Sequence, residues 1–143
     1  MPAEKDLGKL KDLYREYYVR HAARLTLKIL DKVASRVDDF YHDTQTGDRV
    51  YEPDRIMNIF GPFDPYQFNF GFFGIDAART LVFVAATPLL EDAKVDLKPG
   101  DIIVYQGNDH EVLTVKRKED SFFDQWNYSF EQSVACFIPN RGS

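Results

Sequence analysis

The stretch KPGDIIVYQGNDHEVLTV, residues 98–115, constrains the fold more than any other part of this chain. Pro99 and Gly100 predict a tight turn, because proline fixes φ and glycine accepts a positive φ. The pattern that follows is a strand at 102–105, a hairpin loop at 106–109 and a returning strand at 110–115. A turn–strand–turn–strand unit this short is typical of a small, strongly curved β-barrel or sandwich.

Apolar residues recur in steps of four and three from residue 7 to residue 40, which predicts one long amphipathic helix. The stripe consists of Leu10, Tyr14, Tyr18, Ala22, Leu25, Ile29, Val33, Val37 and Phe40. Such a helix would span ~50 Å, whereas a compact domain of this size has a radius of gyration of about 14–15 Å. It would therefore overhang its domain, unless it breaks near Ser35 or wraps around the body. Leu13, Tyr17 and Leu30 widen the apolar face, which predicts contacts on two sides of the helix.

The rest of the chain has the patterns of β-structure. Residues 81–86 form a nearly continuous apolar run, typical of a strand buried on both faces, and residues 128–138 predict a final strand. A short strand is indicated at residues 49–51. The aromatic segment after residue 60 alternates as one face of a strand would, at Phe68, Phe70 and Phe72.

Together these patterns predict an α+β fold. We expect a long N-terminal helix followed by a small, mostly antiparallel β-barrel or sandwich of five to six strands. By its length the chain forms one domain over residues 1–143, with an N-terminal helical arm at 1–41 and a β-barrel body at 48–139.

The charge balance and the cysteine content limit the functions open to this chain. A net charge of −5 and a pI near 5.1 argue against a general electrostatic grip on nucleic acid. Cys136 is the only cysteine in the sequence, so an internal disulfide and a zinc cluster are excluded, and we expect it to lie in the core. The N-terminus lacks the apolar region of a signal peptide and no long apolar run is present, which predicts a soluble protein kept in a reducing cytosol.

The sequence contains no motif for catalysis or cofactor binding. Phosphate-binding glycine motifs and nucleophile-elbow serines are absent, and the histidines His21, His42 and His110 have no metal-binding spacing. In the triplet Asp109-His110-Glu111, a strand would turn the histidine away from its two neighbours, so we predict a solvated turn. We therefore expect no catalytic residue, no metal and no cofactor, and a protein that is not an enzyme.

Large aromatic side chains lie in charged or proline-rich segments of the sequence. Residues 117–127 are charged yet carry Phe122, Phe123 and Trp126, and aromatic residues dominate the energetic centres of protein interfaces. Either these rings fold back over the mouth of the barrel, or they anchor in a neighbouring subunit. The candidate interface residues are Leu10, Tyr14, Tyr17, Tyr18, Phe63, Tyr66, Phe122, Phe123 and Trp126.

The order of these elements resembles a known family. The matching features are a strand ending Phe72-Phe73-Gly74, the apolar strand 81–86, a linker through Leu89-Leu90, the run Pro99-Gly100-Asp101-x-Ile103-x-Tyr105, then Glu111-Val112 and a loop bearing Phe122-Phe123. Over about residues 48–138 this order is similar to the neck, or head-completion, proteins of contractile-tailed bacteriophages. The barrel favours the head-closure (stopper) ring of that neck over the mainly helical connector layer or the tail terminator.

The resemblance implies a structural virion protein at the head–tail junction, assembled in the host cytoplasm. It implies a closed ring of identical subunits, with a hexamer favoured over a dodecamer. The portal or connector ring would lie above it, and the tail terminator or other tail proteins below. The ring would close the DNA-filled head and let DNA pass without sequence-specific binding, with no membrane involved. An acidic lining, which does not bind DNA, suits such a conduit.

Two functions of other classes fit the same residues. The first is a small-ligand-binding or enzymatic β-barrel, with an aromatic pocket lined by Phe68, Phe70, Phe72 and Trp126. The second is a bacterial interaction module that binds a partner through its long helix. A copurifying ligand and a monomeric state in solution would favour the first of these.

Overall fold

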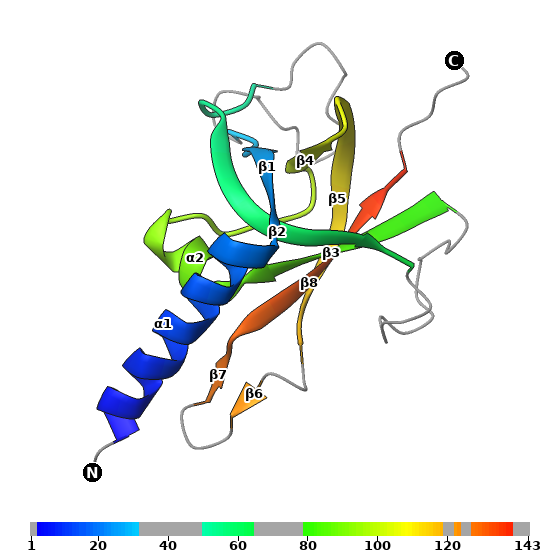
Figure 1. Cartoon of the computed structure of the whole chain (residues 1–143). Helices are drawn as coiled ribbons and strands as arrows, with labels where there is room; N and C mark the ends of the chain where they lie inside the picture. The colour runs from blue at the N-terminus through cyan, green and yellow to red at the C-terminus, as the bar shows by residue number, and fades with distance from the viewer. Residues whose placement is uncertain (1–2, 32–49, 65–78, 119–121, 124–126, 139–143) are drawn as a thin grey trace, which may run out of the picture.

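The computed structural model describes residues 3–31, 50–64, 79–118, 122–123 and 127–138, and shows a β-barrel with a helix against its wall (Figure 1). The barrel strands are β1 (Ala23–Lys28), β2 (Arg55–Phe63), β3 (Thr80–Ala86), β4 (Ile102–Tyr105), β5 (Asn108–Arg117) and β8 (Glu131–Phe137). The remaining elements are α1 (Ala3–His21), α2 (Thr87–Asp92) and a separate two-stranded sheet of β6 (Phe122–Phe123) and β7 (Tyr128–Ser129). The predicted fold, an N-terminal helix ahead of a small antiparallel barrel, is confirmed.

The barrel is closed, and every neighbouring pair of strands in it is antiparallel. The order around the barrel is β1-β2-β3-β8-β5-β4. β1 completes the circle, because Leu25 pairs with Met57 of β2 while Leu27 pairs with Ile103 of β4. Closure leaves no barrel strand with an unpaired edge, so the barrel itself is protected from edge-to-edge association.

The turn–strand–turn–strand unit lies where the sequence predicts it. Gly100 has a φ of 99° and the Asp101 N–H donates to the Lys98 carbonyl at 3.1 Å, as a Pro-Gly turn requires. The hairpin loop is shorter than predicted, since Asn108 and the residue after it already belong to β5. Positive φ angles at Gln106 and Gly107 give the two-residue turn that matches the twist of the strands.

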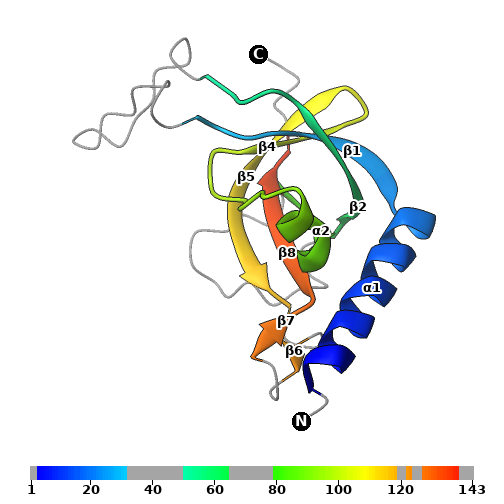
Figure 2. The same cartoon turned by 90° about the vertical axis from the view of Figure 1, so that its left-hand side faces the viewer.

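Side chains from all six strands fill the interior of the barrel. They are Leu25, Leu27, Met57, Ile59, Phe83, Ala85, Ile103, Val112, Val134 and Cys136. α2 and the turn after it add Leu90, Val95 and Leu97, so that α2 closes one end of the barrel, inside the ring of strands in Figure 2. Cys136 lies in this core as predicted, and burial raises the pKa of its thiol above the ordinary value.

The predicted helix over residues 7–40 is wrong from residue 22 to residue 31. α1 ends at His21, and after Ala22 the chain continues as β1, a strand of the barrel. The four-residue spacing of Leu25 and Ile29 fits a helix, but Leu25, Leu27 and Ile29 also alternate with the period of a strand. Pairing with β2 and β4 selects the strand, so the barrel begins well before residue 48. Residues 32–49, with Ser35 and the end of the predicted helix, lie outside the described residues.

Two of the other predicted strands are found with modified ends, and the short strand predicted at 49–51 is not found among its described residues, 50–51. β3 matches the strand predicted at 81–86, and it is buried on both faces. The predicted final strand is divided into β7 and β8, which separate at Phe130. In the short segment at 49–51, Tyr51 forms an isolated bridge with Leu30. Phe68, Phe70 and Phe72 lie outside the described residues.

The environment of His110 differs from the predicted solvated turn. The alternation is as expected, since Asp109 is exposed while His110 points inward and is buried. Its Nδ1 lies 3.0 Å from the Asn108 carbonyl, and its ring packs edge-on against Phe83 and Tyr105. Because the hairpin loop has two residues rather than four, His110 lies inside the barrel wall instead of at the tip.

Asp101 ties the start of the hairpin unit to the end of β1. The carboxylate is almost fully buried and accepts hydrogen bonds from the backbone N–H groups of Leu30 and Lys98, both at 2.8 Å. Each of these donors would otherwise lack a partner at the end of a strand or in a turn.

Asp101→Asn is expected to lower the free energy of unfolding by about 1–3 kcal/mol, because the new NH₂ group would face a backbone donor in a buried site. Urea denaturation measures this change. Asp109→Asn, at an exposed position of the same hairpin, serves as the control and should change stability by less than about 0.5 kcal/mol. Equal effects of the two substitutions would contradict the role given to Asp101.

Candidate interface surface on helix α1

One face of α1 packs on the outer wall of its own barrel. Tyr18 is fully buried there, together with Val84 and Ala86 of β3. Partly buried neighbours complete this cluster: Tyr14, Ala22, Phe60, Phe63 and Leu89. α1 therefore lies along the barrel wall and continues past its end in both views (Figures 1 and 2).

Tyr18 is a core residue, so its prediction as an interface residue is wrong. Its hydroxyl donates a hydrogen bond to the Glu131 carboxylate. Its ring packs edge-on against the Phe60 ring, with the ring centroids 4.7 Å apart. Burial, and then the hydrogen bond to Glu131, raise the pKa of the phenol. The side chain is 0% exposed, so α1 docked on its own barrel presents none of it to a neighbouring subunit.

Three other residues predicted to lie at an interface are partly buried within the chain itself. The Tyr14 ring stacks on Phe130 with centroids 4.9 Å apart and an angle of 13° between the planes. Phe63 packs at the margin of the Tyr18 cluster, and Leu10 is half-buried. Tyr14 and Phe63 contribute to docking of α1 on the barrel, and all three side chains retain some exposed surface.

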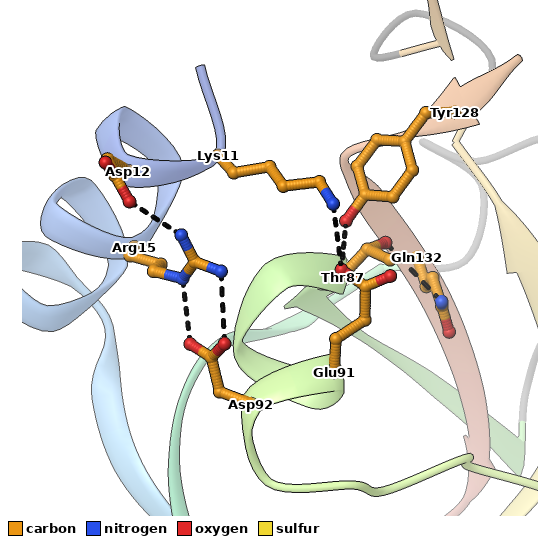
Figure 3. Close-up of polar contacts among 8 residues, drawn as sticks. All are labelled: Lys11, Asp12, Arg15, Thr87, Glu91, Asp92, Tyr128 and Gln132. Carbon is orange, nitrogen blue, oxygen red and sulfur yellow. Dashed lines mark hydrogen bonds and ion pairs between the residues drawn. The ribbon is translucent and has the colours of Figure 1, made fainter. Parts of the chain in front are cut away.

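Charged residues hold α1 against α2 in an arrangement that we call the clasp: Lys11, Arg15, Glu91 and Asp92 (Figure 3). Arg15 donates to both carboxylate oxygens of Asp92, from Nε at 2.8 Å and from Nη2 at 3.0 Å. The Lys11 ammonium nitrogen lies 3.5 Å from Oε1 of Glu91. These contacts bring the last turn of α2, which carries two acids and no base, against two bases of α1.

Tyr128 joins the clasp to the barrel. Its hydroxyl donates to Glu91 at 2.8 Å, and Lys11 lies 4.5 Å from the centroid of its ring. Burial, then the bond to Glu91, raise the pKa of the Tyr128 phenol, and the bond to Asp92 raises the pKa of Arg15. Each charged group of the clasp thus has an opposite partner on another element.

The clasp predicts a salt-sensitive N-terminal half of α1, because surface ion pairs are screened and each is worth only about 0.2–1 kcal/mol. Between low salt and about 1 M salt, amide hydrogen exchange at residues 9–13 should accelerate by roughly two- to fivefold. Exchange at residues 17–21, next to the buried Tyr18, should change much less. Arg15→Gln at low salt should accelerate exchange at residues 9–13 as high salt does. Equal acceleration in both halves of α1 would contradict the role given to the clasp.

The flank of α1 beside the docked face carries apolar side chains that remain in water. Leu13 is 59% exposed and Tyr17 is 55% exposed, one helical turn apart. The ring centroids of Tyr17 and Phe60 lie 5.6 Å apart. Ile56 lies on the same outer face of β2 as Phe60 and is 62% exposed. We call Leu13, Tyr17, Phe60 and Ile56 the apolar strip; it runs from α1 onto β2, where Asn58 lies between Phe60 and Ile56 on the same face.

The strip was only partly predictable. Leu13 and Tyr17 were visible as a widening of the apolar face of the helix, and Tyr17 is a predicted interface residue that the structure leaves exposed. No sequence signal distinguished Ile56, because one apolar residue in a strand has no more than an even chance of facing outward.

The remaining predicted interface residues lie in or beside segments outside the described part of the chain. Tyr66 and Trp126 fall in those segments. Phe122 and Phe123 form β6, whose backbone pairs with β7, but their side chains are not among the described ones. The proposal that these rings anchor a neighbouring subunit stays a prediction.

Among the described residues, no group of three or more potential metal ligands comes together. In the same part of the chain, no helix has the length and apolar character needed to span a membrane. Comparison with known proteins adds no relative: no family model, no curated protein and no solved structure matches this chain.

Proposed function

We propose that this chain is a structural protein that assembles into a closed ring at the neck of a bacteriophage, between the DNA-filled head and the tail. The observation that carries the proposal is the apolar strip, on a barrel whose interior is filled by its own side chains. Exposed apolar patches on a folded protein typically mark sites of association with other macromolecules. A packed interior is typical of a barrel that serves as a scaffold rather than as a ligand container.

Two further features support the neck over other assemblies. A small closed barrel is the fold that the resemblance to head-completion proteins implies. A net charge of −5 suits a channel through which DNA passes without binding. In this proposal the ring, with a hexamer favoured, contacts the portal or connector on one side and tail proteins on the other, and needs no cofactor.

The experiment compares two substitutions of exposed apolar residues on different sides of α1. Leu13 lies in the strip, whereas Val19, equally exposed at 60%, lies more than a quarter turn around the helix from it. Leu13→Glu is expected to weaken subunit association by roughly ten- to hundredfold, the equivalent of one buried apolar side chain. Val19→Glu should leave association unchanged. Sedimentation velocity over a range of concentrations gives the assembled mass of each variant.

Thermal unfolding of both variants provides the control for folding, and we expect it to match the wild type because both positions are exposed. Equal association of the two variants would contradict the strip as the contact surface. A wild-type protein that stays monomeric at every concentration would contradict the ring.

A further inference from the structure

The contacts that hold α1 differ in kind along its length. Its C-terminal end is fixed by the buried Tyr18 and by the hydrogen bond from that phenol to Glu131. Between Asp6 and Tyr17 no described side chain is buried, and this half is held by the surface ion pairs of the clasp and by partly buried contacts such as the stacking of Tyr14 on Phe130. The N-terminal half is therefore the part that opens at lowest cost.

The N-terminal half of α1 covers a surface of the chain that is apolar in the middle and acidic along one side. Phe130, Tyr128 and Leu89 form the floor, against which Tyr14 and Lys11 lie. Glu91 and Asp92 stand along one side, and they meet the two bases of α1 (Figure 3). We call this surface the α1 groove; its acidic side and apolar floor fit an amphipathic helix with bases one turn apart, which is α1 itself.

The connection between α1 and the barrel is short. Ala22 alone separates the end of α1 from the start of β1, and its N–H still donates to the Tyr18 carbonyl at 2.9 Å. When α1 closes on a second barrel, Tyr18 leaves its own barrel with the rest of the helix, and every contact of Tyr18 and of the groove is made again on the second barrel.

We propose that α1 is an exchangeable strap, which opens at the clasp and docks in the α1 groove of a second copy of this chain. The inference rests on the proposed ring, and it names the contact that links one subunit to the next. Each copy gives its helix to one neighbour and receives a helix from the other. Such a contact joins two different surfaces, which is the requirement for a ring that closes.

The experiment uses the ion pair between Lys11 and Glu91, whose charged atoms are 3.5 Å apart. A carbodiimide joins an amine to a carboxylate in direct contact, so the wild-type protein can be linked at this pair without substitution. Equal amounts of unlabelled and ¹⁵N-labelled protein are mixed as monomers, concentrated until they assemble, linked and digested. Mass spectrometry then shows whether the two linked peptides came from one chain or from two.

Exchange predicts light–heavy pairs of the Lys11 and Glu91 peptides, as abundant as the light–light and heavy–heavy pairs together. Lys11→Arg is the matched control, because it keeps the positive charge of the clasp but removes the amine, and the linked product should disappear. An assembled fraction that contains only like-isotope pairs would overturn the exchange and leave the ring in place. A protein that remains monomeric throughout would overturn both proposals.

Discussion

Replacing Gly61 with alanine is expected to destabilise the barrel by about 2–5 kcal/mol, the largest effect we expect from adding a single methyl group. Gly61 has a φ of +131°, a backbone conformation that residues with a side chain rarely adopt. A Cβ atom there would lie 2.8 Å from Cδ1 of Phe83 and 3.0 Å from the Val82 carbonyl oxygen. Phe83 is fully buried and has no room to move aside.

Gly8 provides the matched control for this substitution. It lies on α1, and a Cβ atom added there would meet nothing within 4 Å. Gly8→Ala should stabilise the protein by about 0.5–1 kcal/mol, since alanine is the better helix former. Urea denaturation of both variants measures the difference. A loss of less than about 1 kcal/mol for Gly61→Ala would mean that β2 and β3 can move apart at Gly61, where their register shifts between Phe60 and Phe63, contrary to the packing described.

Replacing Tyr18 with alanine is expected to cost about 3–5 kcal/mol, because it removes a fully buried aromatic ring and leaves a cavity between α1 and β3. It also removes the phenol that donates to Glu131. Tyr17→Ala, at the adjacent and exposed position, should change stability by less than about 1 kcal/mol but weaken assembly. Thermal unfolding and sedimentation velocity of both variants measure the two effects separately.

This pair separates folding from association at neighbouring residues of one helix. If Tyr18→Ala left the melting temperature unchanged, α1 would not be part of the domain core. If Tyr17→Ala unfolded the protein, the apolar strip would be a continuation of that core and not an interface.

The sequence predicted the elements that depend on local chemistry. The Pro99-Gly100 turn, the existence of the hairpin loop after residue 105 and the apolar run of β3 each depend on residues only a few positions apart. Burial of Cys136 followed from its apolar neighbours. These features were recognisable because each residue type satisfies a backbone or burial requirement at its own position.

Features that depend on distant partners could not be predicted in the same way. The segment around Leu25 satisfies both a helical and a strand pattern, and pairing with β2 and β4 decides between them. The choice between Tyr17 and Tyr18 as the buried residue depends on Phe60 and Val84, which reach α1 only in the folded barrel. The acids of α2 gave no signal of a clasp, because their partners on α1 lie about 80 residues earlier in the sequence.

Electron microscopy of the purified, concentrated protein tests the proposed function most directly. We expect closed rings of uniform subunit number, with a hexamer favoured, and native mass spectrometry of the same sample should give a single multiple of the 16.6 kDa subunit mass. Leu13→Glu should yield subunits of the same fold without rings. A monomer at every concentration, particularly one that carries a bound small molecule, would contradict the ring and favour a ligand-binding barrel.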